Sequence, residues 1–342
     1  MSKSWIWRLG VAVALLTGIV VSASAFGRPG AGGGAQGASG PTVRIGWVPA
    51  ASWTPWASLK AEGVNVELVP FKSSNDSLTA LANGSIQMAP VGYNNVAALL
   101  TDSDPKIRFV SGISEHGSVF IARRGSGITT WADLKGKRIA SVRGSTQYVN
   151  LATAMQNHGV DLNKDATFVN MQGFSDLNFA LQRGDVDAIS TFPPLSGQAV
   201  AGGQGVEVPE IQAGMYDGSF TVASGILAAD DFLTDHPDQA ERVLRAFTTR
   251  FEELSADPEK WARTYSALTG VAEEKSLVDA LRKQYIKPAL RMDEKAIRSV
   301  PEVLTRLDII KRDTGDELAG RLDYTLLSKV TGRSAAELGK GK

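Results

Sequence analysis

A short run of small residues, Gly144, Ser145 and Thr146, stands where an apolar strand-like stretch gives way to helical spacing. A turn alone needs only the glycine, whereas this run exposes several backbone N–H groups. Ser145 or its neighbour would cap the helix, and the next N–H groups carry the positive end of the helix dipole. The run therefore predicts either an anion-binding turn or an ordinary helix cap, and Arg143 either adds charge or points to solvent.

Composition restricts the chemistry that this chain can perform. Its 342 residues include 36 basic and 36 acidic residues and no cysteine. Balanced charge gives no field that would attract nucleic acid, so we expect no nucleic-acid partner. The absence of cysteine excludes disulfides, thiolate metal sites, cysteine nucleophiles and a lipid-anchoring cysteine. The length and the 43% hydrophobic content indicate a large core and two domains rather than one.

Histidine is the other residue type that would carry catalysis, and the chain has three. His158 and His236 stand at a predicted helix end and a predicted helix start, where each has a structural explanation. His116, beside Glu115, is the one that we expect to contact a ligand. The sequence contains no serine-hydrolase, zinc-protease or phosphate-loop motif, so we expect a non-enzymatic protein without cofactor or metal.

The N-terminus has the pattern of an export signal. Two basic residues precede an apolar run from Leu9 to Val21, and a small-residue cleavage site ends at Ala25. We predict cleavage near Ala25 and a periplasmic or secreted protein. A retained membrane anchor is the alternative, although the run is shorter than the ~20 residues that span a bilayer. Residues 26–41, rich in Gly and Ala, predict a flexible linker.

From Val43 onward, strand-like and helix-like segments alternate, which indicates α/β layers on mostly parallel sheets. The predicted strands are Val43–Trp47, Val64–Phe71, Ile86–Val91, Ile107–Val110, Val119–Arg123 and Arg138–Val142. Residues 76–86 and 176–186 form an internal repeat of a helix ended by glycine and followed by a strand. The repeat indicates either two similar lobes or a coincidence of common helix-ending chemistry. After about Asp230 the pattern predicts a helical tail.

The predicted strand that follows each copy of the repeat ends in a loop, at residues 92–95 and 191–194. Ligands of open α/β sheets bind outside the carboxyl ends of the strands. If the repeat reflects two lobes, these loops face one another across a cleft.

Residues 126–149, "SGITTWADLKGKRIASVRGSTQYV", resemble periplasmic solute-binding proteins of the SsuA-like sulfonate, nitrate and taurine group, which includes NMT1/THI5-like pyrimidine proteins. The resemblance covers most of residues 42–250, through "ALANGSIQMAPVGYNNVAALL", "ALQRGDVDAISTFPP" and "SGILAADDFLTDHPD". It implies an α/β fold of periplasmic binding protein type II, with two lobes joined by two hinge crossings and a helical C-terminal tail. We place lobe 1 at 42–122 and 223–342, lobe 2 at 123–222, and the crossings near Ala122–Gly125 and Phe220–Ala223.

The resemblance implies a monomeric substrate-binding subunit of an ABC importer, which closes on a small organic anion and delivers it to membrane permease subunits. The candidate ligand-binding residues are Gly144, Ser145, Thr146, Tyr93, Asn94, Trp53, His116, Phe192 and Asp217. A sulfonate is the first choice, and taurine fits if Glu115 or Asp217 faces the cleft. Nitrate and an aromatic or pyrimidine-like solute are the alternatives. An enzyme of the pyrimidine type is disfavoured, because its cysteine-rich motif is absent.

The sequence departs from this family after the first strand. The following segment is shortened and contains Trp53 and Trp56, close to Trp47 at the strand end. Aromatic side chains suit flat or apolar parts of a ligand and equally suit a core. These tryptophans therefore form either one wall of the predicted pocket or part of the core.

Overall fold

The computed structural model describes residues 41–216 and 224–341. The expected signal segment, the expected linker up to Gly40, Asp217 and the expected second crossing lie outside these ranges. Within them, every helix is too short or too polar to cross a membrane.

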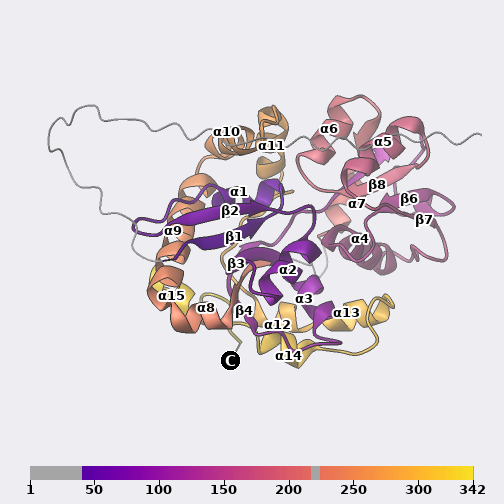
Figure 1. The fold of residues 1–342 in the computed structure, drawn as a ribbon. Coiled ribbons are helices and arrows are strands. Elements are labelled where there is room, and N and C mark those ends of the chain that lie inside the picture. Colours follow the sequence, from indigo (N-terminus) through magenta and orange to yellow (C-terminus); the bar gives the residue numbers. More distant parts are fainter. Residues whose placement is uncertain (1–40, 217–223, 342) are drawn as a thin grey trace, which may run out of the picture. The chain divides into compact units, whose positions relative to one another are not determined.

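Two five-stranded sheets with the same strand order form the centres of two lobes (Figure 1). The first has the order β2 (Val66–Pro70), β1 (Val43–Trp47), β3 (Met88–Gly92), β10 (Ser224–Ala229) and β4 (Ile107–Ser114). The second has the order β7 (Thr167–Asn170), β6 (Arg138–Ser141), β8 (Ala188–Thr191), β5 (Val119–Arg123) and β9 (Gly205–Glu207). In both sheets the first three strands are parallel and the fourth is antiparallel to its two neighbours. The repeat therefore reflects two similar lobes, and the sheets are mixed.

The first crossing between the lobes lies earlier in the chain than expected. It occupies residues 115–118, between β4 of the first sheet and β5 of the second. The expected position at Ala122–Gly125 is corrected, because Ala122 pairs with Ala188 inside the second sheet. The apolar run of β5 fits the core of either lobe, so its composition did not assign it.

The two lobes share the helix that the repeat predicts. Helices α2 (Ser74–Ala82) and α5 (Ser175–Arg183) are the two copies of the repeat, and each is followed by a strand. Gly184 ends α5 with φ of 74°, a left-handed conformation that favours glycine. The remaining helices of this part are η1 (Ala51–Trp53), α1 (Thr54–Ala57), α3 (Tyr93–Leu99), η2 (Ala132–Leu134), α4 (Thr146–Asn157), α6 (Leu195–Ala201) and α7 (Pro209–Gly214).

A helical tail follows β10, as predicted. It contains α8 (Asp230–Asp235), α9 (Pro237–Ser255), α10 (Pro258–Thr269), α11 (Glu274–Arg282), α12 (Glu294–Arg298), α13 (Val300–Arg306), α14 (Gly315–Ala319) and α15 (Thr325–Thr331). Buried Ala240, Val243, Leu244 and Phe247 form the predicted one-sided stripe of α9. This stripe packs α9 onto the core of lobe 1.

All three tryptophans near the first strand belong to the core. Trp56 is fully buried, donates from Nε1 to the Gly46 carbonyl at 2.9 Å and meets the Phe247 ring edge-on. Trp47 and Trp53 are buried in the same cluster. The three rings therefore stabilise the core, and Trp53 also contacts Ser224 beside the candidate site.

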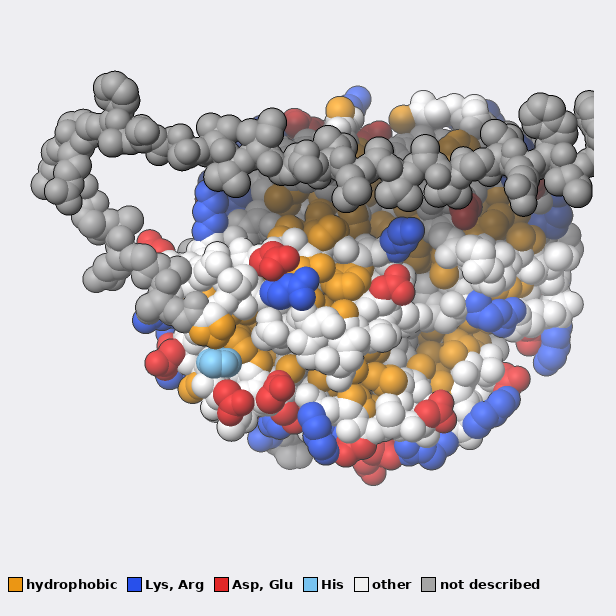
Figure 2. Space-filling model, in the orientation of Figure 1, with side chains coloured by type: hydrophobic (Ala, Val, Ile, Leu, Met, Phe, Trp, Pro, Cys, Tyr) orange, Lys and Arg blue, Asp and Glu red, His pale blue; other side chains and the backbone are white. Residues whose placement is uncertain are grey.

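Acidic and basic side chains are interspersed over the visible face of the molecule (Figure 2). This distribution agrees with the equal numbers of the two charge types in the sequence. Surface charge of mixed sign gives no steering toward a polyanion.

Asp187, immediately before the central strand β8, links the neighbouring strands β5 and β6 of the second sheet. Its carboxylate accepts hydrogen bonds from Arg123 Nη2 at 2.9 Å and from the Arg138 backbone N–H at 3.0 Å. Burial opposes ionisation, but the hydrogen bonds from both arginines outweigh it and hold the pKa of Asp187 well below its usual range. Such a group stabilises the fold above its unfolded pKa, and the contribution is lost as the pH falls toward the folded pKa.

We expect Asp187→Asn to lower the free energy of unfolding by about 1.5–3 kcal/mol at pH 7, because two guanidinium groups lose their charged acceptor. The difference from the parent protein should shrink below about pH 4, where the unfolded carboxyl takes up a proton. Urea unfolding at pH 7 and pH 3 measures both values. Asp185→Asn is the control, because Asp185 forms an exposed ion pair with Arg183. The same difference at both pH values would contradict this role of the Asp187 carboxylate.

Candidate functional site

Segments that follow the carboxyl ends of four parallel strands carry most of the candidate residues. The segments after β1 and β3 belong to lobe 1, and the segments after β6 and β8 belong to lobe 2. After β3 the predicted loop at residues 92–95 is instead the start of α3, which begins at Tyr93. This is the edge at which open α/β sheets bind ligands. Hydrogen bonds between these segments join the two lobes, and we call the region of α3 and α4 where they meet the interlobe junction.

Asn94, at the start of α3, makes the principal contacts of the interlobe junction. Its Nδ2 donates to the Gly144 carbonyl at 2.8 Å, and its Oδ1 accepts from Thr146 Oγ1 at 3.1 Å. A methyl group on Gly92 would come within 2.9 Å of Thr146 Oγ1, so the glycine permits this approach. The structure therefore brings together three of the predicted residues, Asn94, Gly144 and Thr146.

The turn before α4 has the geometry of a helix cap. Ser145 Oγ accepts a hydrogen bond from the Tyr148 backbone N–H at 3.2 Å, which confirms Ser145 as the predicted cap. Gly144 has φ of 77°, so its conformation alone favours glycine. No acidic residue occupies the first turn of this 12-residue helix. Helix α4 begins at the interlobe junction, so the positive end of its dipole lies there without an acidic side chain of the first turn to compensate it.

Arg143 does not add its charge to this turn. Its guanidinium lies over the Phe168 ring at 4.9 Å and over the Tyr148 ring at 5.4 Å. Such cation–π contacts orient the side chain along lobe 2. Backbone N–H groups, the Thr146 hydroxyl and the Asn94 amide therefore supply the polarity of the interlobe junction.

A buried polar cluster lies on lobe 1. Trp53 Nε1 donates to Ser224 Oγ at 3.2 Å, and the hydroxyls of Ser224 and Ser114 are 3.1 Å apart. All three side chains are less than one tenth exposed. The indole N–H of Trp53 is satisfied within the protein, and its ring is buried in the core cluster. The sequence did not indicate either serine, and the structure places them where β4 ends and β10 begins.

Tyr93 lies inside lobe 1, next to Asn94. Its ring packs against Phe109 with centroids 4.4 Å apart and is 2% exposed. The hydroxyl makes no hydrogen bond in the part of the chain that the structure describes. Burial raises the pKa of Tyr93 well above its usual range, so the group stays a neutral donor. Tyr93 is thus a core residue that keeps an unused hydrogen-bond donor.

His116 lies on the first crossing. Its ring stacks on Tyr216 with centroids 3.9 Å apart, and Nδ1 is 2.9 Å from the Gln284 carbonyl. Burial lowers the pKa of His116, and a carbonyl only accepts, so the neutral ring carries its proton on Nδ1. The neighbouring Glu115 forms an ion pair with Lys287 at 2.7 Å. Both residues thus connect the crossing to the C-terminal segment.

The loop after β8 supplies the remaining predicted residue. Phe192 is half-buried and meets Phe174 edge-on at 4.8 Å. The next residue, Pro193, accepts a hydrogen bond at its carbonyl from the Ala51 N–H of lobe 1 at 3.4 Å. Thr191 is fully buried, and its Oγ1 has no partner among the residues described. Asp217 lies outside the described ranges.

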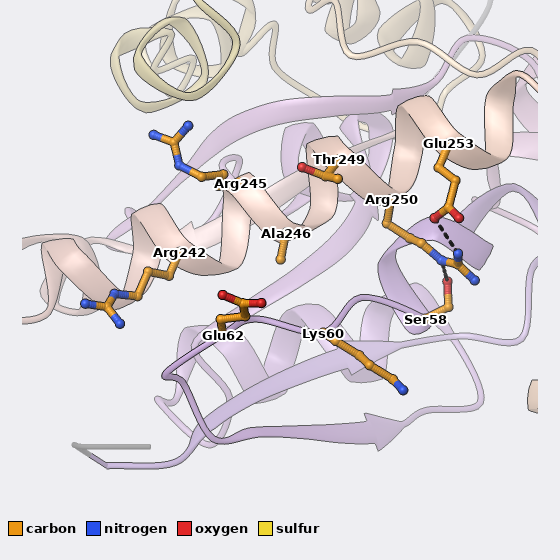
Figure 3. Close-up of a pocket in the computed structure, with 9 residues that line it drawn as sticks. All are labelled: Ser58, Lys60, Glu62, Arg242, Arg245, Ala246, Thr249, Arg250 and Glu253. Carbon is orange, nitrogen blue, oxygen red and sulfur yellow. Dashed lines mark hydrogen bonds and ion pairs between the residues drawn. The ribbon is translucent and has the colours of Figure 1, made fainter. Parts of the chain in front are cut away.

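A separate hollow of about 720 Å³ lies on lobe 1 beside α9 (Figure 3). Arg250 donates to Ser58 Oγ at 3.1 Å and pairs with Glu253, so its charge is already neutralised. In the close-up, Glu62 lies below Ala246, between the basic side chains. A carboxylate at that position opposes an anion, and we do not count this hollow as the ligand site.

Comparison with known proteins connects this architecture to a family. Residues 59–261 match the family described as NMT1/THI5 like. The putative aliphatic sulfonates-binding protein of Bacillus subtilis (strain 168) is 30% identical over 236 residues, which are 64% of this chain and 68% of that protein. The taurine-binding periplasmic protein of Escherichia coli (strain K12) is 25% identical over 204 residues, 60% of this chain and 62% of that protein.

A solved structure confirms the predicted fold. The alkanesulfonate-binding protein SsuA from Xanthomonas axonopodis pv. citri, bound to MOPS, superposes with a TM-score of 0.70. The two chains are 18% identical, and the likeness covers 83% of this chain and 98% of that one. The chain thus has the two-lobe α/β fold of a periplasmic binding protein.

Proposed function

Since the chain belongs to the NMT1/THI5-like family, we propose that it is the substrate-binding subunit of an ABC importer and binds an alkanesulfonate between its lobes. The observation that carries this proposal is the meeting of Asn94 from lobe 1 with the N-terminal turn of α4 from lobe 2. A ligand held there contacts both lobes. It binds the closed form more tightly than the open one and shifts the population toward closure.

The donors of the interlobe junction suit a sulfonate. The N–H groups of the first α4 turn, the second Nδ2 hydrogen of Asn94 and the Thr146 hydroxyl, once it turns from Asn94 Oδ1 to the ligand, are neutral donors, aided by the helix dipole. A sulfonate spreads a single permanent negative charge over three oxygens and accepts several hydrogen bonds. Several neutral donors therefore satisfy it without a buried counter-charge, which would be costly to desolvate.

The same site favours a simple alkanesulfonate over taurine. Taurine also carries an ammonium group, which requires a carboxylate or several acceptors. Glu115 is the predicted carboxylate within the described residues, and it is engaged by Lys287 at 2.7 Å. The buried Trp53 ring and the half-buried Phe192 ring provide apolar surface for a hydrocarbon chain instead.

The proposed cellular role follows from the family and the N-terminal pattern. We infer export with cleavage near Ala25, action as a monomer in the periplasm, and delivery of the ligand to the permease subunits of an importer. N-terminal sequencing of exported protein tests the cleavage, with retention of Met1 as the contrary result.

We expect butanesulfonate to raise the melting temperature more than taurine, nitrate, benzoate or uracil at equal concentration. Binding to the native state alone adds RT ln(1 + [L]/Kd), which is about 2.7 kcal/mol at a hundredfold excess over Kd. Differential scanning fluorimetry over this panel, followed by calorimetry, measures the ranking. A response to uracil or benzoate with none to any sulfonate would overturn the proposed ligand class.

Incubation of the ligand with the protein distinguishes a receptor from an enzyme. After a day with purified protein, butanesulfonate should be recovered unchanged by mass spectrometry. Steady conversion of the ligand would instead favour the enzyme alternative, because a receptor releases its ligand chemically unchanged.

A further inference from the structure

Helix α11 belongs to lobe 1 through its partner helix α10. Trp261 of α10 is fully buried and donates from Nε1 to the Ala51 carbonyl at 2.8 Å, while Tyr265 OH donates to the Pro49 carbonyl at 3.0 Å. The two helices share one apolar cluster with Ala51. The pair is thus fixed to the loop after β1, which also approaches lobe 2 at Pro193.

The outer side of α11 contacts α6 of lobe 2 (Figure 1). A methyl group on Gly197 of α6 would come within 2.5 Å of Ser276 Cβ on α11. Ser276 Oγ is held by the Glu273 carbonyl at 3.0 Å, so this side chain is fixed. Gly197 has ordinary helical backbone geometry, in which alanine is the better helix former. The close approach of the two lobes is therefore the reason for a glycine at this position.

A second contact lies at the end of α11. Glu207, the last residue of β9 in lobe 2, accepts from Lys283 Nζ at 2.7 Å and from Tyr285 OH at 3.2 Å. The Tyr285 ring packs against the apolar clusters of both lobe 2 and the α10–α11 pair. This contact joins a charged pair, a hydrogen bond and apolar burial across the lobe boundary.

We propose that α11 is the surface of lobe 1 that lobe 2 contacts when the protein closes. Its contacts with Gly197 and Glu207 then set the affinity for the ligand. None of these residues belongs to the candidate ligand site. A change in them alters the fraction of closed molecules without removing a ligand contact, and the apparent Kd varies inversely with that fraction. The affinity consequence rests on the proposed function, whereas the closure itself does not.

Distance measurements test the closure without any ligand. The chain has no cysteine, so Glu62→Cys in lobe 1 and Arg183→Cys in lobe 2 introduce the only two spin-label sites. In this background Gly197→Ala should shift the interspin distances to longer values, because the methyl group meets Ser276. Adding Ser276→Gly should restore the original distribution. Unchanged distances in Gly197→Ala would overturn the proposal.

Gly202→Ala is the matched control, since it adds the same methyl at the end of the same helix. There the methyl would meet the flexible Gln204 side chain rather than α11. Calorimetry with butanesulfonate should give about a tenfold weaker Kd for Gly197→Ala, near-parental binding for Gly202→Ala, and recovery in the double variant. Glu207→Gln should weaken binding about threefold. If the parent protein binds no sulfonate, the proposed function fails while the distance measurements still decide the closure.

Discussion

Asn94→Asp is expected to raise the Kd for butanesulfonate at least about 100-fold, the largest loss that we predict for a single substitution. Asn94 is 2% exposed and donates to the Gly144 carbonyl. A carboxylate there loses that donor and places a negative charge beside a bound anion. Like charges brought together in a desolvated site cost several kcal/mol.

Two variants separate charge from the lost hydrogen bond. Asn94→Ala removes both amide contacts without adding charge, and we expect about a tenfold weaker Kd. Asn95→Asp adds the same charge one residue further on, where the parent side chain donates to Asn75 Oδ1 instead of lobe 2. The Kd of Asn95→Asp for butanesulfonate should stay within about threefold of the parent value. Parental affinity in Asn94→Asp, measured by calorimetry on folded protein, would show that the ligand binds away from the interlobe junction.

Strands β1 to β6 were predictable because each one is an apolar run with a distinct start, and the repeat indicated β8, whereas β7, β9 and β10 were not predicted. The β1 and β5 bounds were predicted as observed, and the repeat identified the corresponding α2 and α5 helices. These features depend on neighbours in sequence, which a single chain displays. The position of the first crossing depends instead on which sheet accepts β5, and an apolar run fits both.

The candidate site was only partly predictable for a related reason. Gly144, Ser145 and Thr146 are adjacent in sequence, so their joint position at a helix start could be predicted. Ser114 and Ser224 meet only in the folded chain, and an isolated serine gives no signal of such a contact. The contact of Gly197 with Ser276 is equally long-range. A glycine within a helix does not identify the segment that approaches it, so this contact was found only in the structure.

The two residues that begin α4 are expected to respond differently to substitution. Thr146→Val keeps the shape and removes the hydroxyl, which we expect to weaken butanesulfonate binding by about 1.5–3 kcal/mol, the net value of a hydrogen bond to a charged group. Thr146→Ser keeps the hydroxyl and should bind within about threefold of the parent protein. The Asn94 amide, which Thr146 contacts, remains in both variants.

Ser145→Ala should instead lower the free energy of unfolding by about 0.5–2 kcal/mol and leave the affinity nearly unchanged. The reason is that Ser145 Oγ already accepts from the Tyr148 N–H, whereas the backbone N–H groups that we propose as ligand donors survive the substitution. Calorimetry and urea unfolding on all three variants give the affinity and the stability separately. Parental affinity in Thr146→Val, together with reduced stability in Ser145→Ala, would mean that this turn only starts a helix. Weakened binding in Thr146→Val alone would assign the anion to the first turn of α4.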